Sequence, residues 1–539
     1  MKYFLPLSQR RLSQTFLAGL FGLALLINFP APVKSQRLKD PGPESPSALV
    51  VVPLGRAVVT STAEDESNVT VRVVDIRQFG TLWDNQANYA PNYIDDMVRM
   101  PLVRTWSPSD FAAPDGAQPM HALAISSLGD RIYTGASGYR GNNKPPHIYR
   151  IGPNSTTPAL IATLPFYSAP LNRRAGVSSL ELDEVHNQLF AANYADGIIY
   201  RYDLNGTLLT TFDPLTAYVP TGTILPPYGE RVNALAYNPV ENRLYYGMWG
   251  YAGTTTPNTI RSVGLDSSGG FIPGTDQIEI YLENIAPAGD MEFNRLGNRM
   301  LIAQQPLVLS TDTLELWAHV GRGLEYMGST GAWFKDTTVY GNQLKYAVGN
   351  YSNLDTRGGV AWAYKSIGTY GAVNGDEAFV VFTGDALFHD GIDTEVYGLQ
   401  FTPSTGGGAG GPAVGGPSVG SNSLIADLDY NVLEMDKWAY GDVDIRRRPG
   451  SPGPVSLTGN VWHTNGTPFS KVTIRLSRPT GVAYTALTNG LGYFTFPGVA
   501  TGQTYTLTAS AKNATFSPQT IDVFEGVSDL ELTENSGKP

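Results

Sequence analysis

Four polar residues, His121, Ser178, Asn233 and Asp290, each stand at the start of a strand-like segment. Their side chains offer an imidazole, a hydroxyl, an amide and a carboxylate, groups that hold ligands by hydrogen bonds. The alternative is that a small polar residue at this place only caps its strand. We take the four as candidate ligand-binding residues.

Aromatic residues gather at one place in the chain, where Tyr245, Tyr246, Trp249 and Tyr251 lie within seven residues. Exposed aromatic rings provide area for stacking on a sugar, so Trp249 is a further ligand-binding candidate. Tyr245 and Tyr246 fall inside an expected strand, which favours packing between sheets for those two.

The sequence contains no His-Glu-x-x-His and no phosphate-binding loop, and its 6 histidines are scattered. A string of the form Gly-x-Ser-x-Gly occurs only as GPSVG (416–420), inside a Gly- and Pro-rich run and not between a strand and a helix pattern. It has 0 cysteines, which excludes disulfides and thiolate metal sites. The net charge of −11 argues against a nucleic-acid partner, which requires basic surfaces.

The elements that would position these residues recur along the chain as strand, turn and strand. The recurring segments are MHALAISSLGDRIYTG (120–135), GVSSLELDEVHNQLFAANY (176–194), RVNALAYNPVENRLYYG (231–247) and GDMEFNRLGNRMLIA (289–303). Their turn residues Asp130, Asn187, Asn242 and Asn298 are spaced by 57, 55 and 56 residues. A strand-and-turn repeat of about 50 residues is typical of propeller blades, whose inner strands line a central channel.

The repeat predicts a propeller of about six blades. The first four begin at the segments above, and HIYRIG (147–152), IIYRYD (198–203) and TIRSVG (259–264) supply later strands at matching offsets. A divergent fifth blade is expected within 344–401, and SLIADLDYNVLEMDKWAYGDVDI (423–445) is expected to be the next unit, with Asn431 in its turn. Residues 47–118 are expected to lead into the propeller and to contribute a strand that closes the ring. If they form a complete blade instead, the propeller has seven blades.

Composition divides the chain into regions. Residues 36–46 are expected to be a disordered leader, and 47–448 the propeller. The run TGGGAGGPAVGGPSVG (405–420) predicts a flexible loop, and Pro and Gly at 449–454 predict a linker. Residues 455–539 then contain seven short alternating strands, which predict a β-sandwich. The expected fold class is therefore all-β.

The last region resembles a known family. LTGNVWHTNGTPFSKVTIRLS and TNGLGYFTFPGVATGQTYTLTASAKNATFSPQTIDV are similar to the carboxypeptidase regulatory-like domain, a transthyretin-like β-sandwich grouped with carbohydrate-binding-like folds. The resemblance implies an appended module of exported proteins without peptidase activity. Residues 120–445 resemble, more loosely, exported bacterial propellers.

Two segments also resemble the six-bladed calcium-dependent lactonases. VNALAYNPVENRLYYG and GDMEFNRLGNRML are similar to that family's Asn-Gly-Leu-Ala and Asp-Gly-Met motifs, which implies that Asn233 and Asp290 are metal ligands for Ca²⁺. The chain departs from the family at Ala234 and Met291, which replace glycines, and it lacks the Glu-Gly-Pro motif. The expectation is accordingly no cofactor, with Ca²⁺ as the alternative.

The N-terminal residues predict export. Lys2, Arg10 and Arg11 precede an apolar stretch from Phe16 to Ile27, and a signal-peptide cleavage site is expected near Ser35. Removal of residues 1–35 would take away four positive charges and leave a net charge of −15. No later stretch is apolar enough to span a bilayer. We expect the mature chain outside the cell, in the periplasm or at the cell surface.

These expectations favour a non-catalytic binding protein whose ligand is an extracellular glycan or protein. The alternative is a metal-dependent lactonase-type hydrolase acting in the propeller channel. A purely structural role is a third possibility that the sequence leaves open.

Overall fold

A computed structural model gives the fold of most of the chain between residues 51 and 535. The structure describes residues 51–52, 56–61, 70–76, 98–99, 102–111, 116, 119–136, 145–153, 155, 157–165, 176–194, 196–214, 231–249, 257–283, 286–305, 307–309, 314–316, 320–338, 344–349, 354–363, 377, 379–389, 395–408, 423–427, 440–446, 455–478, 481–500, 503–523 and 527–535. These residues form β-strands and one short 3₁₀ helix, Pro108–Asp110. No helix in this part of the chain is long and apolar enough to cross a membrane.

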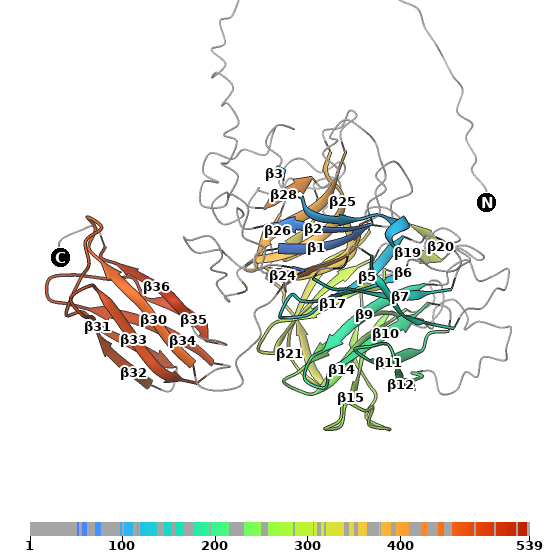
Figure 1. Cartoon of the computed structure of the whole chain (residues 1–539), viewed down its shortest axis with the longest axis horizontal. Helices are drawn as coiled ribbons and strands as arrows, with labels where there is room; N and C mark the ends of the chain where they lie inside the picture. The colour runs from blue at the N-terminus through green and yellow to red at the C-terminus, as the bar shows by residue number, and fades with distance from the viewer. Residues whose placement is uncertain are drawn as a thin grey trace, which may run out of the picture. The chain divides into compact units, whose positions relative to one another are not determined.

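The first three blades are four-stranded antiparallel sheets whose strands follow the chain order (Figure 1). The first blade contains β5 (Met120–Ile125), β6 (Ile132–Ala136), β7 (His147–Ile151) and β8 (Ala159–Thr163). The second contains β9 (Val177–Asp183), β10 (Gln188–Asn193), β11 (Ile199–Asp203) and β12 (Leu208–Phe212). The third contains β13 (Arg231–Asn238), β14 (Arg243–Trp249), β15 (Thr259–Gly264) and β16 (Gln277–Tyr281).

The fourth and fifth blades are less regular. The fourth contains β17 (Ala288–Phe293), β18 (Arg299–Gln304), β21 (Gly323–Ser329), β22 (Ala332–Lys335), β23 (Tyr346–Ala347) and β27 (Gly407–Gly408). The fifth contains β24 (Thr356–Ala363), β25 (Phe379–His389), β26 (Glu395–Pro403), β28 (Leu424–Asp427) and β3 (Val98–Arg99). A separate hairpin joins β19 (Leu307–Leu309) to β20 (Leu314–Leu316).

Both ends of the propeller build the sixth blade, in the strand order β29–β1–β2–β4. Its inner strand, β29 (Tyr440–Ile445), pairs with β1 (Arg56–Ser61), followed by β2 (Val71–Asp75) and β4 (Leu102–Trp106). The inner strands contact one another in the order β5, β9, β13, β17, β24, β29 and back to β5, which closes a ring. The propeller therefore has six blades, because the N-terminal strands fill only three places of the last one.

Two expectations about the later blades need correction. Segment 423–445 is not one unit, because β28 completes the fifth blade while β29 begins the sixth; Asn431 lies outside the described residues. Local pattern could not separate them, since neither strand pairs with the other. The start of the 405–420 run is also ordered: β27 runs parallel to β23, with Gly407 opposite Tyr346. Residues 409–422 lie outside the described part.

The four turn residues lie where the repeat predicted them. Asp130, Asn187, Asn242 and Asn298 each occupy the turn between the first two strands of a blade. Asn187 and Asn242 have φ of 55° and 51°, a left-handed conformation that Asn tolerates better than most residues. In the other two turns a glycine takes this conformation one position earlier.

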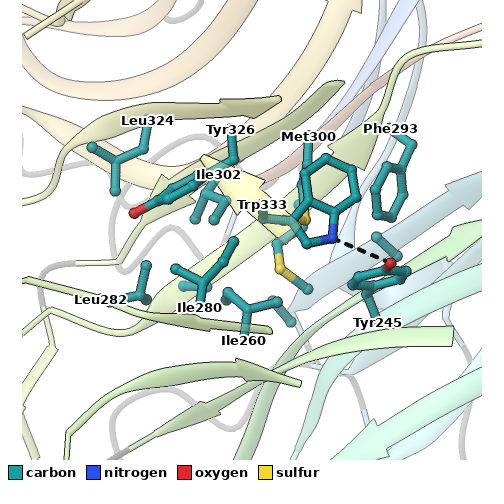
Figure 2. Packing of buried hydrophobic residues seen from close by; sticks show 14 of the residues in the cluster. Tyr245, Ile260, Ile280, Leu282, Phe293, Met300, Ile302, Leu324, Tyr326 and Trp333 are labelled. Atoms are coloured by element: carbon teal, nitrogen blue, oxygen red, sulfur yellow. Dashed lines mark hydrogen bonds between the residues drawn. The ribbon is translucent and has the colours of Figure 1, made fainter. Parts of the chain in front are cut away.

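Large aromatic residues fill the space between the third and fourth blades. Figure 2 shows Tyr245, Phe293 and Trp333 in one cluster, with the Trp333 indole N–H donating to the Tyr245 hydroxyl at 3.3 Å. The rings of Tyr245 and Trp333 meet edge to face, 5.9 Å apart. Tyr245 and Tyr246 are fully buried, which confirms that these tyrosines pack between blades.

The C-terminal region forms the expected seven-stranded sandwich. One sheet has the order β33 (Tyr493–Val499), β30 (Val455–Trp462), β36 (Val527–Thr533). The other has the order β32 (Gly481–Leu487), β31 (Thr473–Arg478), β34 (Gln503–Ser510), β35 (Gln519–Val523). Along β30 every second residue is buried, as the alternating sequence requires for a strand with one face on a core.

Candidate functional site

Each of the first four inner strands carries a β-bulge near its start. Pairing with the second strand breaks between Met120 and Ala122, between Val177 and Ser179, between Val232 and Ala234, and between Ala288 and Asp290. The extra residues are therefore His121, Ser178, Asn233 and Gly289. A bulge leaves one residue out of the ladder and redirects its side chain.

The four predicted site residues are thus not equivalent. His121, Ser178 and Asn233 are bulge residues, whereas Asp290 follows the bulge and matches Ala122, Ser179 and Ala234. A shift of one residue reverses the face of a strand, so Asp290 projects differently from the other three.

The bulge side chains bind the neighbouring blade. Ser178 Oγ donates to the carbonyl of Val232 at 2.8 Å, and Asn233 Nδ2 donates to the carbonyl of Ala288 at 2.6 Å. His121 lies against the closing blade, where a Cβ added to Gly441 would come within 2.7 Å of its Nδ1. Ser178 and Asn233 are buried, and the Asn233 Oδ1 atom has no partner among the described residues.

The positions after the bulge alternate around the ring between polar and small residues. Polar pairs stand on β9, β17 and β29: Ser179 and Glu181, Asp290 and Glu292, Asp442 and Asp444. The matching positions of β13, β24 and β5 hold Ala234 and Ala236, Gly359 and Ala361, Ala122 and Ala124. A strand with a polar pair is followed each time by a strand with glycine or alanine at the two matching positions.

The polar pairs accept backbone N–H groups of the next blade. Ser179 Oγ and Glu181 Oε1 accept from Leu235 N and Tyr237 N, at 3.1 and 3.0 Å. Asp290 Oδ2 accepts from Val360 N at 2.9 Å, and Glu292 Oε2 accepts from Trp362 N.

The third pair acts in the same way at the point where the ring closes. Asp442 Oδ2 and Asp444 Oδ2 accept from Leu123 N and Ile125 N, both at 3.0 Å. At three of its six junctions, the ring is tied by paired side chains two residues apart.

Two of these carboxyl groups also meet each other. The side chains of Asp290 and Asp442 hydrogen-bond to each other. Protein atoms surround both carboxyl groups, although each residue retains a small solvent-exposed area. Burial raises the pKa of Asp290 to about 7. Burial, and then the negative charge of Asp290, raises the pKa of Asp442 well above its usual value. The raised pKa of Asp442 means that the pair keeps a proton near neutral pH.

The structure places the remaining candidate, Trp249, away from solvent. Its side chain is 1% exposed, so the expectation of an exposed stacking platform at Trp249 is wrong. Trp249 is the last residue of β14 and is paired with Arg231, the first residue of β13. Its buried side chain is therefore part of the packing of the third blade.

The proposed calcium ligands do not assemble a set of oxygens. Asp290 accepts N–H groups from Val360 and Met291, and Asn233 uses its amide N–H group within the protein. Within the described ranges, no three His, Asp or Glu side chains converge as metal ligands. The buried Asn233 Oδ1 atom accepts no hydrogen bond and could ligate a cation. Ca²⁺, however, takes about six to eight oxygen ligands, and one free oxygen does not supply them. Binding of Ca²⁺ by Asn233 and Asp290 stays the alternative to the expectation of no cofactor.

Sequence reasoning missed Glu181, Glu292, Asp442 and Asp444. A signal was present, because Ser-Leu-Glu (179–181), Asp-Met-Glu (290–292) and Asp-Val-Asp (442–444) all have a polar residue, an apolar residue and an acid in succession. In a strand this spacing puts both polar side chains on one face.

Comparison with known proteins identifies the C-terminal region. Residues 456–532 match the carboxypeptidase regulatory-like domain family, which confirms that resemblance for this part of the chain. No curated protein shows significant sequence similarity to the chain.

Several solved structures are similar to the chain, at very low identity and with low TM-scores. A chain of a nidogen/laminin complex is 10% identical with a TM-score of 0.37, covering 73% of this chain and 98% of that one. Hydrazine synthase of Kuenenia stuttgartiensis is 8% identical with a TM-score of 0.35, over 69% of this chain and 80% of the other. A functionally unknown protein from Desulfotomaculum acetoxidans is 12% identical with a TM-score of 0.33, over 71% and 92%.

Proposed function

We propose that the protein is an exported, non-catalytic binding protein whose ligand is a glycan or protein outside the cell. The observation that carries the proposal is how the acids of the inner strands are used. Glu181, Asp290, Glu292, Asp442 and Asp444 each accept a backbone N–H of the next blade. A catalytic acid or base must instead reach the substrate, so acids committed to holding the blades together favour a rigid scaffold.

Two further features support this proposal. The N-terminal segment has the features of an export signal, and residues 456–532 match a carboxypeptidase regulatory-like domain. The raised pKa values of Asp290 and Asp442 favour the alternative, because paired carboxyl groups with raised pKa values also occur in active sites. The lactonase-type hydrolase therefore remains the competing function.

The test compares binding with turnover in the full mature chain and in Asp290→Asn. Asparagine keeps an acceptor for Val360 N but cannot exchange the proton. Binding is measured by calorimetry against a panel of soluble polysaccharides and envelope proteins, and turnover with lactone and ester substrates. We expect saturable binding of one class, no turnover and the same affinity in the variant. Chelator-sensitive lactone hydrolysis that Asp290→Asn abolishes would show an enzyme instead.

A further inference from the structure

The sixth blade meets the first blade at a seam between the inner strands β29 and β5. On one side β29 is fixed by its ladder with β1, in which Ala57 is opposite Ile445. On the other side two carboxyl groups of β29 reach β5: Asp442 Oδ2 accepts from Leu123 N, and Asp444 Oδ2 accepts from Ile125 N. This seam therefore depends on the chemistry of two carboxyl groups.

Two further residues strengthen the seam. Thr60 Oγ1 donates to the carbonyl of His121 and accepts from Asp442 N at 2.9 Å. Arg446, just after β29, donates to the carbonyls of Ser127 and Val52 at 3.1 and 2.8 Å. These two Arg446 bonds go to backbone oxygens of the neighbouring segments and not to Asp444.

Negative charge surrounds Asp444 instead. Asp290 from β17 and Glu184 from the β9–β10 turn act on it through their charges, and Asp442 lies two residues away on its own strand. Glu184 is held at this place because its Oε1 accepts from Ser127 N at 3.0 Å.

The other strands packed on β29 carry charged groups as well. Besides His121 on β5, their charged groups include Arg357 on β24 and the Arg56–Asp75 ion pair of β1 and β2, 2.8 Å long. Arg56 is thus already neutralised by Asp75.

We propose that the β29–β5 seam is a pH-sensitive latch, closed most firmly while Asp444 is protonated and loosened when Asp444 ionises. Ionisation adds a negative charge near Asp290, which protein encloses, so the repulsion between these two groups is weakly screened. Opening of the seam moves Asp444 away from Asp290 and exposes the Asp444 carboxylate to solvent. The latch goes beyond ligand binding, because it makes closure of the ring depend on the pH outside the cell.

The direction of the effect follows from the pKa of Asp444. Burial, followed by the negative charge of Asp290, outweighs the hydrogen bonds from Ile125 N and Ile445 N and raises this pKa to about 7. A carboxyl group with a raised pKa stabilises the closed state at low pH, and this stability is lost as the pH rises toward the raised value. Between about pH 4 and about pH 7 the opening equilibrium should therefore rise by about tenfold per pH unit and then level off.

The test is hydrogen exchange of the full mature chain at about pH 5 and about pH 7, corrected for the intrinsic effect of pH on exchange. Peptides containing Leu123 and Ile125 report on the latch. The matched control is the β9–β13 seam, where Ser179 and Glu181 hold Leu235 N and Tyr237 N. We expect protection of β5 to fall at the higher pH while protection of β13 stays constant.

Two variants test whether Asp444 causes the pH dependence of protection at β5. Asp444→Asn keeps an oxygen for Ile125 N but does not titrate, so the pH dependence at β5 should shrink; Glu181→Gln, its matched counterpart, should leave that dependence intact. An equal loss of protection at both seams, or an unchanged pH dependence in Asp444→Asn, would overturn the latch. If Asp444→Asn does not fold, the comparison of the two seams in the wild-type chain decides, and constant β5 protection between the two pH values refutes the proposal.

Discussion

The carboxyl groups of Asp290 and Asp442 hydrogen-bond to each other although β24 separates their strands, β17 and β29, in the ring. The contact forms because β24 has Gly359 at the matching position. A Cβ on Gly359 would lie 2.7 Å from the carbonyl oxygen of Gly441 and 2.9 Å from Thr383 Oγ1. The glycine lets three inner strands approach closely enough for acids of two blades to meet.

The Gly359→Ala variant should therefore destabilise the propeller. The added methyl group has no space, and overpacking of this kind costs about 1–3 kcal/mol. Urea unfolding followed by tryptophan fluorescence measures the loss. Gly152→Ala is the control, because no atom lies within 4 Å of the Cβ it would add. Equal stability of the two variants would contradict the close approach.

Replacement of Glu292 tests whether the acids act as ties between blades. Glu292→Ala leaves Trp362 N without its acceptor and should cost about 1–3 kcal/mol of unfolding free energy. Glu292→Gln retains an acceptor oxygen and should stay close to the wild type. Both are measured by chemical denaturation. If glutamine is as harmful as alanine, the charge matters and not the hydrogen bond.

The turn residue Asn187 tests the blade repeat at an exposed position. Its φ of 55° is accessible to glycine and asparagine but strained for a β-branched residue. We expect Asn187→Gly to be nearly neutral and Asn187→Val to lower stability by about 1–2 kcal/mol. Val185→Ala, in the same turn and 62% exposed in the wild type, controls for surface changes. Thermal melting of the three variants provides the comparison.

Calcium should leave the melting temperature of the propeller unchanged. The amide N–H group of Asn233 and the oxygens of Asp290 already bond to backbone groups and to Gln305. If they shared a cation, a free-ion concentration about 100-fold above Kd would add about 2.7 kcal/mol to the free energy of unfolding. Thermal melting with calcium and with chelator measures this difference. A calcium-dependent rise that Asp290→Asn removes would restore the lactonase-type interpretation.

Acid should destabilise the fourth blade through Asp336. Burial raises the pKa of this carboxyl group, but the hydrogen bonds from Lys345 and Thr338 outweigh burial and lower it to about 2. A lowered pKa means that the stability is present above the unfolded value near 4 and is lost as the pH falls toward 2; its size is about 2 kcal/mol. Urea unfolding across this range should show a smaller loss in Asp336→Asn than in the wild type. An identical loss in both would exclude the Lys345–Asp336 contact, 2.7 Å in the structure, as its source.

The sequence by itself determined the features that depend on neighbours along the chain. Turn chemistry at Asn187 and Asn242 and the alternation of β30 follow from backbone preferences and from the two-residue period of a strand. These features predicted the blades, the sandwich and the burial of Tyr245 and Tyr246 within a strand. They also placed His121, Ser178 and Asn233 correctly as equivalent residues.

Only the tertiary structure decided how distant segments meet. The bulge at Gly289 put Asp290 one residue out of register with the other candidates, and a bulge is a property of the pairing between two strands. The pairing of β29 with β1 fixed the blade count at six, and no local pattern links residues nearly 400 apart. The protonation of Asp290, Asp442 and Asp444 depends on burial and on each other's charges, which exist only when the ring is closed.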